Sequence, residues 1–145
     1  MPEQHRSTDD VGESSRATCE FFEVASYSRA IAKIGEGNVV SEATIRADVV
    51  AFRMAYRASK PGGPLPRSFQ HKELGKIAGQ YRVSQIYVGK GNYRVALLFI
   101  HSGKRAYLVD IFKKTKNENK KQVKVALDRA AHCWDQLSDE EKKGQ

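Results

Sequence analysis

Basic side chains concentrate in one stretch of this 145-residue chain, residues 81–121. The stretch carries ten Lys and Arg residues against two acids, so it supplies almost all of the net charge of +8. Positive charge gathered in one region is typical of proteins that handle a polyanion. The side chains that we expect to contact phosphate groups are Arg82, Tyr87, Lys90, Arg94, Lys113, Lys114, Lys116, Lys120 and Lys121.

Arg94 is the residue best suited to chemistry on a phosphate. It is a lone guanidinium in an otherwise apolar segment, which is a costly place for an unpaired charge. Its planar fork matches two phosphate oxygens. Lys113, Lys114 and Lys116 follow the last strand in the sequence, so we expect them to rim a groove whose floor holds Arg94.

A simpler interpretation of the same residues stays open. Arg94 would pair with Asp110 on the neighbouring strand, and the lysines would be a solvated run before a helix.

Three strands with two tight turns are expected to carry these side chains. The segments 81–88, 93–100 and 105–112 are apolar, and the turns at 89–92 and 102–103 contain glycine. Alternation predicts that Tyr93, Val95, Leu97 and Phe99 meet the helices and that Arg94 points away from them. In the last strand, the same rule puts Leu108, Asp110, Phe112 and Lys114 on the open face, with Tyr107, Val109, Ile111 and Lys113 on the other.

Helices are expected on either side of these strands in the sequence. A first strand spans 20–27, and Ser28 caps a short helix that ends near Gly35. A longer helix follows Ser41 and ends before the loop 60–66; 67–79 is ambiguous, with a turn of helix around 71–74. The longer helix presents Ile45, Val49, Phe52 and Tyr56 along one stripe, and the final helix presents Val123, Leu127, Ala130 and Trp134.

The whole reads as one α+β domain at 19–137, with its helices packed on one sheet face. Residues 1–18 are expected to be a disordered arm and 138–145 a charged, frayed tail.

Other site classes are not indicated. The histidines at 5, 71, 101 and 132 have no metal-ligand spacing, and no phosphate-binding loop or nucleophile motif is present, so we expect neither metal nor cofactor. Cys19 and Cys133 are far apart and are expected to be free thiols in a reducing compartment. No apolar run is long enough for a membrane span, and the polar N-terminus is no signal peptide. These features favour a soluble, cytoplasmic protein.

The order of elements and two short motifs resemble the RelE/ParE toxin superfamily, in particular its phage-derived, HigB-like branch. The motifs are Tyr93-Arg94 in the middle strand and Lys113-Lys114-Thr115-Lys116 after the last strand. The likeness covers about residues 20–134 as an order of elements, and about 93–130 carries the motifs.

This resemblance implies a type II toxin that cleaves mRNA, usually on the ribosome, and that is silenced by a bound antitoxin protein. Arg94 matches the arginine that contacts the scissile phosphate, and Lys113 and Lys114 match the basic residues after the last strand. The implied cleavage through the 2′-hydroxyl needs a base, an acid and stabilisation of charge at phosphorus. No well-placed His or Glu supplies the base, so we expect Lys113, Lys114 or Lys116 to act as base or to neutralise the developing charge. The chain departs from the branch at Asp110, where a histidine is common, and at Ile86-Tyr87, where an arginine is common. Non-catalytic alternatives are a ParE-like gyrase inhibitor and a basic nucleic-acid-binding module.

Overall fold

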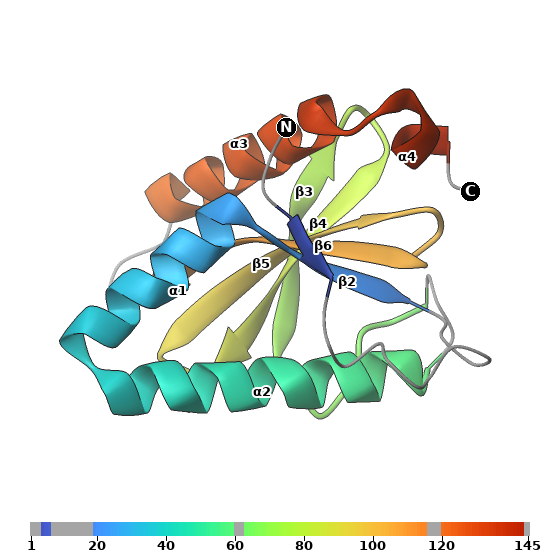
Figure 1. The fold of residues 1–145 in the computed structure, drawn as a ribbon. Coiled ribbons are helices and arrows are strands. Elements are labelled where there is room, and N and C mark those ends of the chain that lie inside the picture. Colours follow the sequence, from blue (N-terminus) through green and yellow to red (C-terminus); the bar gives the residue numbers. More distant parts are fainter. Residues whose placement is uncertain (1–3, 7–18, 60–62, 116–119, 144–145) are drawn as a thin grey trace.

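The computed structural model describes residues 4–6, 19–59, 63–115 and 120–143 (Figure 1). The chain is an α+β fold, as expected, built on one six-stranded sheet. Its elements are β1 (Gln4–Arg6), β2 (Glu20–Val24), α1 (Ala25–Gly37), α2 (Val39–Arg57), β3 (His71–Ile77), β4 (Tyr81–Val88), β5 (Tyr93–Ile100), β6 (Arg105–Lys113), α3 (Lys120–Gln136) and α4 (Asp139–Lys143).

The strand order is β1-β2-β6-β5-β4-β3. β2 runs parallel to β6, and every other neighbouring pair is antiparallel. The three consecutive strands β4, β5 and β6 form the predicted meander, with bounds within one residue of those expected. β2 therefore sits beside the last strand of the meander and brings the α1–α2 pair onto the sheet.

Two strands extend the sheet beyond the prediction. β3 pairs with β4 where a turn of helix was expected around residues 71–74, so that expectation was wrong. Exposed polar residues on this edge strand give it no clear strand pattern, and pairing with β4 determines its conformation. β1 pairs with β2, so the expected disordered arm does not hold for residues 4–6. The rest of that arm lies outside the described residues.

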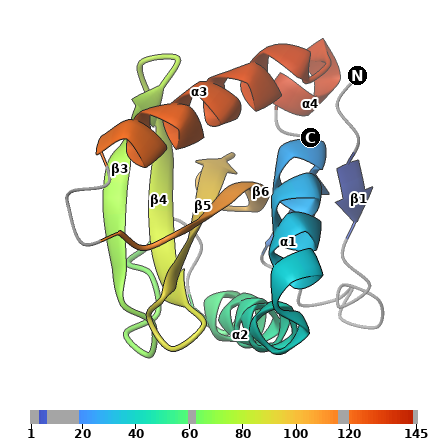
Figure 2. The same ribbon diagram turned by 90° about the vertical axis from the view of Figure 1, so that its left-hand side faces the viewer.

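Helices cover both faces of the sheet, and the expectation that they share one face was wrong. Figures 1 and 2 show α3 and α2 on opposite sides of the strands. The α1–α2 core contains the predicted stripe of α2 and the predicted face of β5, namely Ile45, Val49, Phe52, Tyr56, Val95, Leu97 and Phe99, with Tyr93 partly buried against it. The α3 core contains Val83, Ala96, Leu98, Ile100, Tyr107, Val109, Ala126, Ala130 and Cys133.

A bulge at Val109 explains why the predicted facing of β6 was wrong for Tyr107, Leu108 and Val109 and right from Asp110 onward. Ala96 pairs with Asp110 and the next residue, Leu97, pairs with Leu108, so Val109 has no partner in β5. Leu108 packs in the α1–α2 core, while Tyr107 and Val109 pack in the α3 core. Val109 and Asp110 are therefore successive residues on the α3 side, and regular alternation resumes after Asp110.

The helix ends differ from those expected for local reasons. α1 begins at Ala25, before Ser28, without a side-chain cap, because β2 leads directly into it. α2 is capped by Asn38, whose side chain accepts a hydrogen bond from the Ser41 N–H at 3.0 Å. None of the described helices is long and apolar enough to cross a membrane.

The C-terminal helices were only partly anticipated. α3 buries its small residues Ala126, Ala130 and Cys133, which let it approach the sheet closely, while Leu127 and Trp134 are partly buried beside them. The tail expected to fray forms α4 up to Lys143.

Candidate nucleic-acid interface

Arg94 and Tyr87 form a stacked pair at one end of the sheet. They are direct partners across β4 and β5, and the guanidinium carbon lies 3.5 Å from the centre of the tyrosine ring. The Nη1 group donates to the carbonyl of Gly91 at 2.8 Å and to that of Tyr93 at 3.2 Å. The carbonyls of Gly91 and Tyr93 and the face of the Tyr87 ring thus stabilise the positive charge of Arg94.

Arg94 is only 4% exposed, so it is not the floor of an open groove. Both of its hydrogen bonds use Nη1, which leaves Nε and Nη2 as donors. Neither of these nitrogens is among the buried, unpartnered polar atoms of the described side chains. Nε and Nη2 are therefore the donors of Arg94 that remain for a further partner.

Asp110 binds a different arginine from the one expected in the simpler interpretation. Its Oδ1 accepts a short hydrogen bond from Nη1 of Arg129 in α3, and it also accepts from its neighbour, the Ile111 N–H, at 2.8 Å. Burial raises the pKa of Asp110, and the nearby Arg129 charge opposes that rise. Asp110 thereby ties β6 to α3 and leaves Arg94 without a carboxylate partner among the described residues.

Lys113 and Lys114 lie beside Arg94 but on different faces. Lys113 pairs with Tyr93, and the Lys114 N–H donates to the Asn92 carbonyl at 2.8 Å. Alternation then places Lys114 on the same side as Arg94, while Lys113 shares the side of Tyr93. Both lysines are exposed. Of the two, Lys114 is the one arranged to act together with Arg94.

A groove opens along the free edge of β6, between α1 and α3. β2 pairs with β6 only at residues 105–108, so beyond that point none of the described strands pairs with β6 on this side. The α1–α3 groove has a volume of about 510 Å³ and contains Lys33, Asp110, Lys113, Lys121 and Arg129 around the apolar side chains Ile34, Ile111 and Val125. With four bases against one paired acid, it is electropositive.

The turn between β4 and β5 is held by a residue of α2, which packs on the face of the sheet opposite to α3. Asp48 of α2 accepts a hydrogen bond from the Gly89 N–H at 2.8 Å. Gly89, Lys90 and Gly91 all have positive φ, and Lys90 is exposed at the tip. The Asp48 anchor thus holds Lys90 and the Gly91 carbonyl, which in turn positions Arg94.

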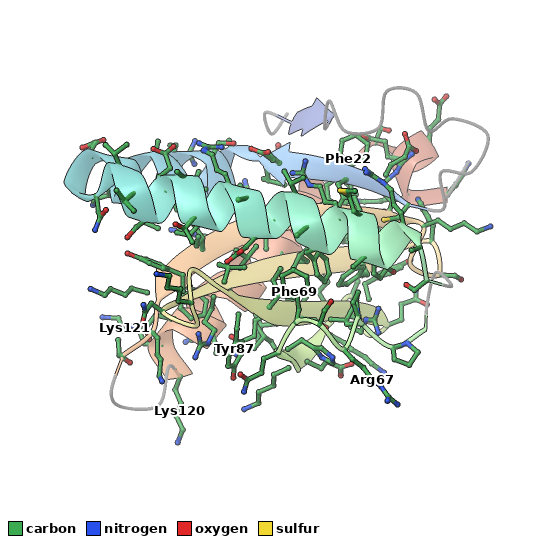
Figure 3. The ribbon with its side chains drawn as sticks, turned by 90° about the horizontal axis from the view of Figure 1, so that it is seen from below. Phe22, Arg67, Phe69, Tyr87, Lys120 and Lys121 are labelled. Atoms are coloured by element: carbon green, nitrogen blue, oxygen red, sulfur yellow. The ribbon has the colours of Figure 1, made fainter. Side chains whose placement is uncertain are left out.

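The other predicted contact residues divide into two groups. Figure 3 shows Tyr87, Lys120 and Lys121 toward the same end of the molecule, with Arg67 toward the other. Arg82 lies away from Arg94, stacked 4.7 Å over the Phe99 ring on the α2 side. Phe99 is five residues from Arg94, about 17 Å along the strand. Lys116 lies outside the described residues.

Three residues of this region were missed from the sequence: Lys33, Asp48 and Arg129. Lys33 and Arg129 lie on α1 and α3, two helices that are far apart in the sequence and adjacent in the structure. The residues around each of them in the sequence therefore do not indicate that they line one groove. Asp48 lies between Ile45 and Val49 of the buried stripe, and its position beside that stripe was the available sign that it faces the sheet.

The cysteines have no place in this interface. Cys19 and Cys133 are free and buried. Burial raises the pKa of both thiols, that of Cys133 to about 12. Neither forms a thiolate nucleophile near neutral pH.

Compared with protein-family models, with curated proteins and with solved structures, this chain matches none. Within the described part of the chain, no group of three or more His, Cys, Asp or Glu side chains could hold a metal ion. The groups that this end of the sheet offers to a phosphate include its basic side chains and Tyr87. Together they can bind two or more phosphates and stabilise charge at one of them.

Proposed function

We propose that this protein is a RelE-like toxin of a type II toxin-antitoxin system, an endoribonuclease that acts on mRNA in the cytoplasm. The order β2-α1-α2-β4-β5-β6-α3, with β2 beside β6, supports this proposal alongside the two motifs. The extra strand β3 and the helix α4 are additions of this chain to the arrangement that the resemblance implies.

One observation carries the proposal. The register of β4, β5 and β6 brings Tyr87, Arg94 and Phe112 side by side, directly before Lys113 and Lys114. A guanidinium edge, an exposed amine on the same side and an electropositive groove are thus neighbours on adjacent strands. This combination suits an RNA backbone, because its phosphates need several cations at short intervals.

The proposed reaction is an attack of a ribose 2′-oxygen on the adjacent phosphorus. Lys114, in its neutral form, takes the 2′-hydroxyl proton while the new O–P bond forms. Arg94 donates from Nε and Nη2 to the non-bridging oxygens as charge accumulates on them. The P–O5′ bond then breaks, and the 5′-oxygen takes a proton from water or a protonated lysine. The products are a 2′,3′-cyclic phosphate and a 5′-hydroxyl.

Lys113, Lys120 and Lys121 bind flanking phosphates in this proposal, with Lys90 contacting the strand at the turn. Tyr87 holds the guanidinium in plane, which fixes the direction of its free edge. Lys113 and Lys121 are both in the α1–α3 groove. The groove would guide RNA toward Arg94.

Two partners belong to the proposal through the resemblance. The ribosome would position the mRNA, which compensates for a site without a strong base. A cognate antitoxin would silence the toxin by covering its basic surface with acidic side chains.

A second candidate is a non-catalytic relative, either a gyrase inhibitor or a nucleic-acid-binding module. The low exposure of Arg94, 4%, favours it, because a catalytic arginine must touch the phosphate. In that case the same basic surface binds nucleic acid without cleaving it.

A pair of neighbouring lysine variants tests the proposal. Purified protein is mixed with ribosomes programmed with mRNA, and the cleaved ends are mapped. We expect Lys114→Ala and Arg94→Ala each to lower the cleavage rate about 100-fold or more, and Lys113→Ala to weaken binding with a smaller effect on rate. The 3′ fragment should begin with a 5′-hydroxyl, and a 2′-deoxy nucleotide at the cut position should block the reaction.

An equal loss of cleavage rate in Lys113→Ala and Lys114→Ala would contradict the specific role of Lys114 as the base. Cleavage by Arg94→Ala at the wild-type rate would contradict the proposed nuclease mechanism. Intact mRNA accompanied by gyrase-dependent DNA breaks would favour the gyrase inhibitor, and intact mRNA without breaks the binding module.

A further inference from the structure

A second basic hollow lies at the end of the sheet opposite Arg94. This α4 pocket, of about 610 Å³, is formed by β3, β4, the turn between β5 and β6, and α4. Its cationic lining consists of Lys76, Arg82, Lys142 and Lys143, with His101 beside them. In Figure 1, α4 lies next to the turn that joins β5 to β6.

The last two lysines are held in place by a dedicated set of contacts. Ser138 and Glu141 form a reciprocal capping box: each side chain accepts a hydrogen bond from the other's backbone N–H, at 3.1 and 2.9 Å. His101 Nε2 lies 2.6 Å from the Glu141 carbonyl, so Nε2 carries the proton and donates. These contacts attach α4 to the turn after β5.

An aromatic stack supports the same arrangement. Tyr81 and Trp134 pack with ring centres 4.2 Å apart, and Nζ of Lys142 lies 5.2 Å from the centre of the Trp134 ring. A cation over an aromatic ring is stabilised, which restricts where Lys142 can place its charge. A charged tail without a role would need none of these contacts.

The charges around the α4 pocket are not balanced by protein groups. Lys76 and Arg82 are direct partners across β3 and β4, and like charges in that position repel. No ion pair links Lys76, Arg82, Lys142 or Lys143 to a carboxylate of the described residues. Glu73 is the one acid among the lining residues. A bound anion would relieve this repulsion.

We propose that the α4 pocket binds backbone phosphates of single-stranded RNA. The large exposed apolar side chains of the described structure lie on α2 and α3, outside this pocket. Protein partners need an apolar core at the interface, and the phosphate backbone of RNA does not. The choice of RNA rests on the proposed function. It adds a second contact about 17 Å from Arg94, so one RNA chain could be held at two points.

The test is direct binding of a non-cleavable RNA, a fluorescent 20-nucleotide 2′-O-methyl oligonucleotide, across a range of salt concentrations. The variant Lys76→Ala/Lys142→Ala removes two contacts. At about −0.7 per contact, the slope of log K against log salt should become about 1.4 less steep, and affinity at 0.1 M salt should fall about 25-fold. The matched control is Lys72→Ala/Lys124→Ala, two exposed lysines outside the pocket.

Circular dichroism of each variant checks the fold. Lys76→Arg/Lys142→Arg, which keeps the charge, should bind as the wild type does. A Lys76→Ala/Lys142→Ala variant with unchanged affinity and slope would overturn the proposal. An equal loss in the control would also overturn it, because the effect would then come from overall charge. Unchanged RNA binding with lost binding to polyglutamate would assign the pocket to an acidic protein instead.

Cleavage is not part of this readout, so the two proposals fail separately. A wild type that cuts no RNA while the pocket variant still loses 25-fold in binding would remove the nuclease and leave the pocket assigned.

Discussion

Arg94 and Tyr87 face each other across two neighbouring strands, and the guanidinium carbon lies 3.5 Å from the ring centre. The Tyr87 ring therefore fixes the position of the Arg94 guanidinium at this end of the sheet. Removing the ring would leave the guanidinium held only by its hydrogen bonds to the carbonyls of Gly91 and Tyr93.

Tyr87→Ala should lower the unfolding free energy by about 2 kcal/mol, because it removes a largely desolvated cation–π contact. Tyr87→Phe keeps the ring and should change stability by less than about 0.5 kcal/mol. Urea denaturation measures both. RNA cleavage should fall in Tyr87→Ala and persist in Tyr87→Phe. Loss of cleavage in both variants would mean that the hydroxyl, and not the ring, is needed.

Asp110→Asn should change how stability depends on pH. The pKa of Asp110 is raised above its ordinary value of 3.8, mainly by burial, so the folded protein holds this proton more tightly than the unfolded chain. The stabilisation is complete below 3.8 and is lost as the pH rises through the raised pKa. Asn cannot titrate, so the stability advantage of the wild type over Asp110→Asn should shrink over that interval.

Thermal unfolding between pH 3 and 8 measures this difference. Asp128→Asn, an exposed change in the same helix as Arg129, is the control. An advantage that grows with pH in the wild type would show that the Arg129 ion pair outweighs burial, contrary to the prediction.

Gly89→Ala should destabilise the protein more than Gly91→Ala. Both glycines have positive φ, 61° and 82°, so both substitutions strain the backbone. An added Cβ at Gly89 would lie 2.9 Å from a ring carbon of Tyr93, whereas at Gly91 nothing lies within 4 Å. We expect a cost of about 1 kcal/mol at Gly91 and about 2–3 kcal/mol at Gly89. Equal costs in urea denaturation would indicate that Tyr93 moves aside freely.

Ser138→Ala should loosen α4. It removes one half of the capping box with Glu141, a loss of about 1 kcal/mol. Amide hydrogen exchange within residues 141–143 should accelerate about fivefold, while the sheet stays protected. Ser138→Thr keeps the hydroxyl and should restore protection. Unchanged exchange in Ser138→Ala would show that His101 alone holds the helix.

The meander and the α2 stripe were predictable because strict alternation and a four-three-four spacing leave little choice of face. Tyr93, Val95, Leu97 and Phe99 were confirmed on the α1–α2 side, and Ile45, Val49, Phe52 and Tyr56 against them. The site was less predictable, because its parts come from separate elements. Arg82 carries the same charge as Arg94 and lies in the strand beside it, yet it lies at the other end.

The predictions that were wrong concern elements whose structure depends on contacts between distant parts of the chain. Local sequence patterns do not reveal such contacts. β3 is a strand because β4 lies beside it. The second helical layer was missed because two charged residues, Arg94 and Asp110, make the α3 face of the sheet look polar in the sequence. In the structure, backbone carbonyls bind Arg94 and the distant Arg129 binds Asp110, so a helix can cover this face. α4 was missed because its Ser-x-x-Glu signature stands in a run of charges.

Val109 has no pairing partner in β5, and the side chains of β6 are divided between the α1–α2 core and the α3 core. Before it, Leu108 lies among the side chains of the α1–α2 layer; after it, the carboxylate of Asp110 points to Arg129. A deletion of this single valine would restore regular alternation, with Leu108 still opposite Leu97 and Asp110 still opposite Ala96, so the change would remove only the Val109 side chain from the α3 core. One additional backbone unit thus lets two successive residues face the final helix, so this strand adds an apolar side chain to that layer without displacing the carboxylate that binds Arg129.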